Sequence, residues 1–155
     1  MPEKAIFKIA LDKAMAQCSY REFCCDDIHN KLSLWGVDNS DSEKIIAILV
    51  SENFINEPRY AAAFVRDKFK YNKWGKAKIA AHLNSKKLPS DIIKTALDSI
   101  DNEQYNKLLR GLIEGHRRTI KAKNQYDLKA KLLRYGLSKG FESNLLYDML
   151  NEMGD

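Results

Sequence analysis

Apolar residues recur at helical spacing along the whole chain, and no stretch shows the sustained alternation of apolar and polar residues that is typical of half-buried strands. This pattern predicts a first helix over about 5–17, a second over about 21–33 and a third that begins at Ser40. Ser40 is followed three residues later by Glu43, which is the spacing of a capping box. The chain is therefore expected to be all-α.

The same periodicity predicts which side of each of these helices faces the core. In the first helix the amphipathic stripe is expected to consist of Ile6, Ile9, Ala10 and Lys13. In the second helix we expect Cys25, Ile28 and Leu32 to point inward, and the third helix carries the apolar residues Ile45, Ile46, Leu49 and Val50.

One arrangement of apolar residues occurs three times. The spacing i, i+1, i+4, i+5 is found in Ile45, Ile46, Leu49 and Val50, then in Ile92, Ile93, Ala96 and Leu97, and again in Leu145, Leu146, Met149 and Leu150. Each copy follows a short loop with an apolar residue (Val37, Leu88 or Phe141), and another stands nine positions earlier (Ile28, Ile79 or Leu132). The pattern predicts three tandem three-helix units at about 5–52, 53–100 and 103–155, each similar to a helix-turn-helix module, within one domain over 1–155.

The helix that follows Pro58 divides into an apolar side and a basic side. At about 100° per residue, four cations share a stripe about 60° wide, namely Arg59, Arg66, Lys70 and Lys73. Aromatic and aliphatic residues lie opposite, and Trp74 with Gly75 is expected to end the helix. Lys68 falls on the apolar side, where it must either extend past its neighbours or pair with a carboxylate.

Charge is concentrated in two basic blocks. The chain carries a net charge of +5, but residues 59–94 and 107–139 each contain 10 Lys or Arg and only 2 Asp or Glu. Such segregation favours a polyanion or an acidic protein as partner. The candidate binding surface comprises Arg59, Arg66, Lys70, Lys73, Lys76, Lys78, Lys86, Lys87, Arg117, Arg118, Lys121, Lys123, Arg134 and Lys139.

Candidate chemistry is sparse. The chain contains no phosphate-binding glycine loop, no zinc-protease helix motif and no hydrolase nucleophile motif, so we expect a non-enzyme without a cofactor. Cys18, Cys24 and Cys25 do not have the spacing of a zinc module and are expected to be packing residues. Asp26 and Asp27 are expected to be exposed at a helix start. Because no apolar run approaches the roughly 20 residues of a membrane span, and the N-terminus lacks the core of a signal peptide, a cytoplasmic protein is expected.

The central unit resembles the RecX family of bacterial recombination regulators. The similarity is carried by Phe54-Ile55-Asn56-Glu57, Arg59-Tyr60-Ala61, Phe64-Val65-Arg66 with Lys68, and then Gly75, Ile79, Leu83 and Lys87-Leu88. In the last unit, Lys131, Leu132, Arg134-Tyr135 and Lys139-Gly140-Phe141 are similar to that family's C-terminal repeat. The chain departs from the family pattern at Gly136, where an apolar residue is usual, and at His82, where a carboxylate is frequent.

The resemblance implies three tandem three-helix repeats forming an elongated, curved body. It also implies a regulator, expected to be a monomer, that binds the RecA recombinase filament on DNA and modulates its ATPase and strand exchange, with inhibition the expected direction. Single- and double-stranded DNA are implied partners. Two alternatives remain open: a stand-alone helix-turn-helix protein that binds duplex DNA, and an adaptor whose helical repeats bind an acidic protein.

Overall fold

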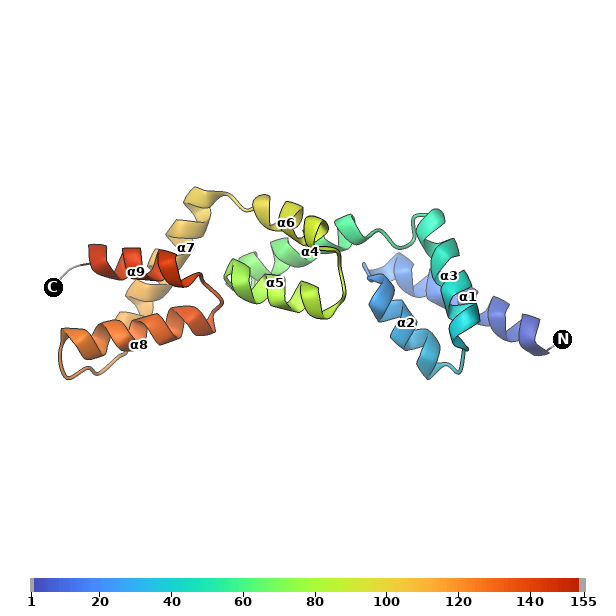
Figure 1. Ribbon diagram of the computed structural model, residues 1–155, viewed down its shortest axis with the longest axis horizontal. Coiled ribbons are helices and arrows are strands. Elements are labelled where there is room, and N and C mark those ends of the chain that lie inside the picture. The colour runs from blue at the N-terminus through green and yellow to red at the C-terminus, as the bar shows by residue number, and fades with distance from the viewer. Residues whose placement is uncertain (1, 154–155) are drawn as a thin grey trace. The chain divides into compact units, whose positions relative to one another are not determined.

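The computed structural model describes residues 2–153, with side chains from residue 5 onward, and within this range it contains helices and no strands (Figure 1). The all-α prediction is therefore confirmed. The helices are α1 (Pro2–Tyr20), α2 (Cys25–Leu34), α3 (Asn39–Ser51), α4 (Glu57–Lys70), α5 (Lys76–Ser85), α6 (Ser90–Asp98), α7 (Asn102–Arg117), α8 (Gln125–Ser138) and α9 (Ser143–Glu152).

The helices form two compact units. The first comprises residues 1–64 and 83–93, and the second residues 65–82 and 94–155. No helix in the described part of the chain is long and apolar enough to cross a membrane.

The core of the first unit is built mainly from α1, α2 and α3. Fully buried side chains are contributed by Ala14 of α1, by Ile28 and Leu32 of α2, and by Ile45 and Leu49 of α3. Ile28 and Leu32 were predicted to point inward, and that prediction is confirmed, whereas Val50 of the apolar set in α3 is 48% exposed.

The predicted stripe of α1 is confirmed at Ala10 and wrong at Ile6 and Ile9. Ile6 and Ile9 are 49% and 65% exposed, whereas Ala10 and Ala14 are buried. Phe7, Leu11, Met15 and Cys18 pack beside these alanines. The small alanine side chains allow another helix to approach closely, so the inward face of α1 is centred on its smallest apolar residues rather than on its largest.

Helix starts in the first unit follow their capping groups rather than the predicted positions. The second helix begins at Cys25, not near Arg21, and the Cys24 N–H donates to Asp27 Oδ2 (3.4 Å). The third begins at Asn39, because Asp38 Oδ1 accepts from the Asp41 N–H (2.8 Å), so the expected Ser40–Glu43 capping box is not the one used.

The second unit is packed around α7, α8 and α9. Leu109 and Ile113 of α7 are fully buried, as is Leu146 of α9, and Leu132 of α8 is 2% exposed. Gly136 makes room for this packing, because a Cβ there would lie 2.3 Å from Leu146 Cδ2. The glycine that departs from the family pattern is therefore matched by the leucine that occupies its space.

Main-chain hydrogen bonds connect the start of α5 to the turn between α8 and α9. The Gly75 N–H donates to the Lys139 carbonyl (2.8 Å), and the Ala77 N–H donates to the Gly140 carbonyl (2.9 Å). A Cβ on Gly75 would lie 2.4 Å from the Gly140 carbonyl carbon and oxygen. Only glycine permits this approach at position 75.

The same turn closes α2, α5 and α8. In each, an amide donates to the carbonyl five residues earlier: Val37 to Leu32 (3.0 Å), Leu88 to Leu83 (3.4 Å) and Phe141 to Gly136 (3.1 Å). The residue before each donor has a positive φ, 82° at Gly36, 62° at Lys87 and 94° at Gly140. All three donor residues are buried, which explains the apolar loop position in each copy of the sequence pattern.

Candidate partner-binding surface

Arg59 is committed to contacts within the first unit. Its Nε–H donates to Glu22, and its Nη2 contacts the carbonyls of Asn53 (3.2 Å) and Phe54 (3.4 Å). Its main-chain N–H donates to Asn56 Oδ1 (2.9 Å), which caps the start of α4. The Arg59 side chain is 41% exposed, so part of the guanidinium remains accessible.

The remaining cations of the predicted stripe lie at and beyond the C-terminal end of α4. Arg66 and Lys70 are exposed on the helix, and Arg66 lies 3.6 Å from Asp67, a contact between largely exposed groups. Lys73 is not helical, because α4 ends at Lys70 and Lys73 has a φ of 57° in the following turn. The prediction that the helix reaches Trp74 and carries Lys73 on its stripe is wrong.

Two of the lysines lie near the indole ring of Trp74. Lys68 Nζ lies 5.0 Å and Lys78 Nζ 4.7 Å from the Trp74 ring centroid, within the range of cation–π attraction. The imidazole of His82 lies 4.7 Å from the same ring. Lys68, which the sequence left unplaced, thus lies over an aromatic face that also receives Lys78.

Lys86 and Lys87 pair with carboxylates at the start of α2. Lys86 Nζ lies 2.7 Å from Asp27 Oδ1, and Lys87 Nζ lies 3.5 Å from Asp26 Oδ1. The side chains of Asp26 and Asp27 are only 16% and 12% exposed, so the expectation that they are exposed is wrong. Partial burial raises the pKa of Asp27, but hydrogen bonds from Lys86 and Cys24 outweigh it and leave the pKa below its usual value.

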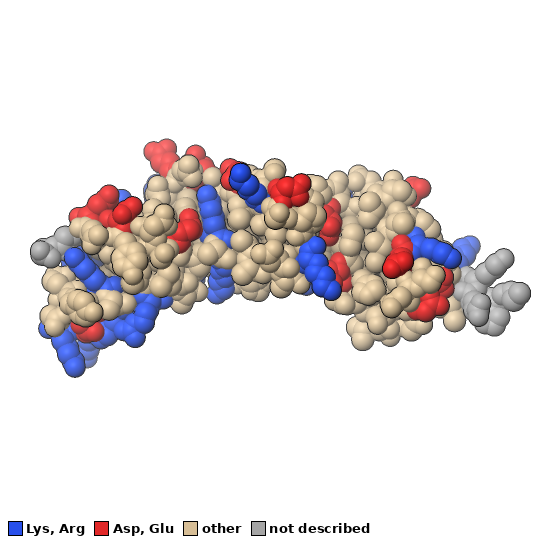
Figure 2. Space-filling view, in the orientation of Figure 1, with Lys and Arg blue, Asp and Glu red and all other residues tan. Residues whose placement is uncertain are grey.

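The second basic block surrounds the connection between α7 and α8. Arg117, Arg118, Lys121, Lys123 and Arg134 are exposed there. Basic side chains gather over α8 in Figure 2. Lys139 does not belong to this group, because its Nζ donates to the Asn72 carbonyl (3.3 Å).

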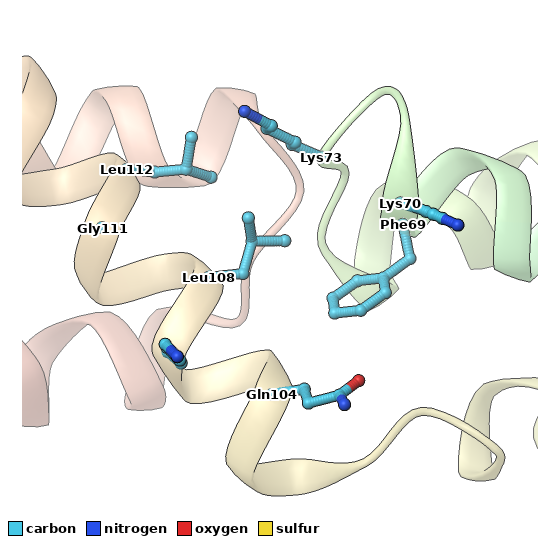
Figure 3. A pocket seen from close by; sticks show the side chains of 8 residues that line it. Phe69, Lys70, Lys73, Gln104, Leu108, Gly111 and Leu112 are labelled. Atoms are coloured by element: carbon cyan, nitrogen blue, oxygen red, sulfur yellow. The ribbon is translucent and has the colours of Figure 1, made fainter.

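A groove lies between α7 and the C-terminal end of α4 with the turn that follows it. Its volume is about 450 Å³, and it is lined by Phe69, Lys70, Lys73, Gln104, Lys107, Leu108, Gly111 and Leu112 (Figure 3). Lys70 and Lys73 were predicted from sequence; Lys107, Gln104 and the leucines were not. The feature of the sequence that could have indicated this groove is the i, i+4 pair of Leu108 and Leu112 beside Lys107.

The cysteines and the buried tyrosines are held in their neutral forms. Burial raises the pKa of Cys24 to about 12 and that of Cys25 to about 11. Metal ligation and nucleophilic attack require the thiolate, so these thiols are poorly suited to either at neutral pH. Burial, followed by the hydrogen bond to Glu142, raises the pKa of Tyr105 above its usual value.

Comparison with known proteins gives a consistent assignment. The family model described as RecX, second three-helix domain, matches residues 56–97. "Regulatory protein RecX" of Clostridium botulinum (strain Eklund 17B / Type B) is 32% identical over 127 residues, which cover 81% of this chain and 59% of the relative. The chain belongs to the RecX family.

Other members agree with this assignment. "Regulatory protein RecX" of Vibrio parahaemolyticus is 27% identical over 130 residues, covering 84% of this chain and 82% of the relative. The chain spans between half and two thirds of the length of the clostridial relatives that it matches.

Two solved structures share the fold. "Crystal structure of regulatory protein RecX" matches with a TM-score of 0.87 at 23% identity and covers 97% of this chain and 74% of the other. "Crystal structure of RecX from Lactobacillus salivarius" matches with a TM-score of 0.83 at 20% identity and covers 96% and 97%.

Proposed function

We propose that this chain is a regulatory protein that binds the RecA recombinase filament on DNA and lowers its ATPase and strand-exchange activity. The observation that carries the proposal is the family assignment, because the relatives are named regulatory proteins. The exposed cations at the end of α4 and around the α7–α8 connection support it, since cations at a surface bind phosphates without regard to base sequence.

We propose that the binding surface is smaller than the sequence suggests. Arg66, Lys70 and Lys73 in the first basic block, and Arg117, Arg118, Lys121, Lys123 and Arg134 in the second, are exposed and available to a filament. The ion pair with Asp27 reduces the availability of Lys86, whose side chain is 38% exposed, whereas the Lys87 side chain stays 80% exposed.

We also propose that the fold consists of three tandem three-helix repeats, with α1–α3, α4–α6 and α7–α9 as the copies. The recurring turn after α2, α5 and α8 supports this division, because it places an equivalent buried residue at Val37, Leu88 and Phe141.

The deciding experiment is a titration of the chain into RecA bound to single-stranded DNA, with ATP hydrolysis and co-sedimentation as readouts. We expect the hydrolysis rate to fall at substoichiometric amounts of the chain. If hydrolysis is unchanged and the chain stays in the supernatant, the proposal is wrong. A selection on random duplexes that yields a preferred site would instead favour a stand-alone duplex-binding protein.

A matched pair of variants localises the surface. The triple variant Arg66→Ala, Lys70→Ala, Lys73→Ala removes three charges from the first basic block. The control Lys8→Ala, Lys44→Ala, Lys94→Ala removes three charges from exposed positions outside the proposed surface. With single-stranded DNA alone, each lost phosphate contact should reduce the log–log salt slope by about 0.7, and the control should leave the slope unchanged.

A further inference from the structure

The groove beside α7 combines an apolar floor with a cationic rim. Phe69, Leu108 and Leu112 form its floor, and Lys73 and Lys107 stand at its edge, with no Asp or Glu among the residues that line it. Lys70 also lines the groove, but its side chain points away from α7, and its Nζ lies 5.4 Å from the Tyr71 ring centroid (Figure 3). Leu108 and Phe69 point toward one another across the groove, and Lys73 extends over it from the turn (Figure 3). An apolar recess with lysine side chains at its edge suits a ligand that carries an apolar group between negatively charged groups.

Packing and main-chain hydrogen bonds outside the groove hold its lining residues in place. The Phe69 ring packs against the buried Tyr105 ring, with centroids 6.1 Å apart. The turn that carries Lys73 is fixed by the Trp74 N–H, which donates to the Lys68 carbonyl (3.1 Å), and by the Gly75 N–H, which donates to the Lys139 carbonyl (2.8 Å). The recess is therefore formed before any ligand arrives, which reduces the entropy lost on binding.

Gly111 leaves part of the groove open. A Cβ at this position would meet no atom within 4 Å, although Leu108 and Leu112 lie beside it on α7. The missing side chain leaves open space on this part of the groove surface.

We propose that this groove docks a short acidic peptide segment of a partner protein, which inserts one large apolar side chain between Leu108, Leu112 and Phe69. The carboxylates of the segment lie against Lys73 and Lys107. This partner contact is separate from phosphate binding and does not depend on which filament or protein the chain regulates.

A peptide fits the groove better than a nucleic-acid strand does. Base stacking needs an open aromatic face. The floor offers two leucines, and the Phe69 ring is half-buried with Tyr105 packed against it. Aliphatic side chains provide apolar contact without a planar platform, and this favours a leucine-like or aromatic anchor on a flexible acidic chain.

The test uses fluorescence anisotropy with two labelled dodecapeptides of Asp and Glu. One has two adjacent leucines at its centre, and the other has two serines there. We expect the leucine peptide to bind at least tenfold more tightly at 150 mM salt, because only it can fill the floor. Equal affinities would show binding by charge alone and would overturn the proposal, as would the absence of binding by either peptide.

Two glycines of α7 provide a matched pair of variants. Gly111 lines the groove and Gly115 does not, yet a Cβ at either position meets nothing within 4 Å. Gly111→Glu and Gly115→Glu therefore change net charge and helix propensity equally and differ in which one places a carboxylate in the groove. We expect the first to weaken binding of the leucine peptide at least tenfold and the second to change it less than threefold.

Nucleic acid is tested in the same format with a labelled oligo-dT of equal length. If Gly111→Glu weakens oligo-dT binding as much as peptide binding, while Gly115→Glu spares both, the groove is a nucleic-acid site and the peptide proposal is wrong. Retention of full peptide affinity by Gly111→Glu would also overturn it. No RecA is present in these peptide-binding measurements, so a negative result does not contradict the proposed function. A negative RecA titration likewise does not contradict peptide binding in the groove.

Discussion

Lys86 Nζ lies 2.7 Å from Asp27 Oδ1, although the two residues are 59 positions apart in the sequence. Asp27 also accepts from the Cys24 N–H at the start of α2, so one carboxylate caps a helix and binds the turn between α5 and α6. Both groups belong to the first compact unit. The ion pair therefore joins the central helices to the N-terminal ones within that unit.

We expect Asp27→Asn to lower the free energy of unfolding at pH 7 by about 1–2 kcal/mol, because the substitution removes a charged partner from both donors. Since the folded-state pKa of Asp27 lies below its unfolded value, its contribution is present above about pH 4 and is lost as the pH falls through the folded pKa. Urea unfolding at pH 7 and pH 3 measures the difference, which should be smaller at pH 3. Glu43→Gln, on the exposed side of α3, is the control and should show little effect at either pH.

Gly75→Ala should destabilise the chain, because the new methyl group would meet the main chain of Gly140 and Phe141 at 2.4–2.5 Å. A loss of about 1–3 kcal/mol is expected for such overpacking, with a matching fall in the thermal midpoint. Gly111→Ala, where there is open space, should instead gain up to about 1 kcal/mol from helix propensity. A similar response of the two variants in thermal denaturation would contradict the close contact at Gly75.

Alanine substitutions of Arg59 and Arg66 should affect different properties of the chain, although the sequence placed both residues on one stripe. Arg59→Ala removes contacts to Glu22 and to two carbonyls, and should cost about 1 kcal/mol of stability. Arg66→Ala should leave stability unchanged and reduce the salt dependence of DNA binding. Chemical denaturation and a salt titration on both variants separate the two roles, and the same profile for both would show that the distinction is wrong.

The Tyr105 hydroxyl connects the start of α5 to the start of α9. It accepts from the Lys76 N–H (2.8 Å) and donates to Glu142 Oε1. Tyr105→Phe leaves both partners unpaired in a partly buried place and should cost about 1–3 kcal/mol.

The pH dependence of this effect follows from the raised pKa. Because the folded-state pKa of Tyr105 exceeds its unfolded value of about 10, the stability that the neutral phenol supplies is lost as the pH rises above 10. The difference between the wild-type chain and Tyr105→Phe should therefore narrow between pH 9 and pH 11. A constant difference in urea unfolding across that range would argue against an elevated pKa.

Helix positions were predictable where a single local signal decides them. The helices that carry the second and third copies of the i, i+1, i+4, i+5 spacing are found where that spacing places them, as α6 and α9. The start of α3 was misplaced because two possible caps, Asp38 and Ser40, stand two residues apart, and the sequence alone does not say which oxygen reaches an amide.

The site was less predictable because it depends on contacts between distant segments. The charge pattern correctly picked out exposed cations such as Arg66 and Lys70, but it could not show that Lys86 faces a carboxylate 59 positions away. The groove was missed for the same reason, since Phe69 and Leu108 lie on different helices and meet only in the folded chain.

The contact between Gly75 and Gly140 has a consequence for how the sequence can diverge. Its hydrogen bonds run between main-chain atoms, which every residue type except proline supplies at the donor positions. Substitutions around this junction can therefore accumulate without altering it, provided that the two glycines stay. In an alignment of relatives, we expect Gly75 and Gly140 to be invariant where the surrounding residues vary. The pair would then give the α8–α9 turn the same orientation in chains of low sequence identity.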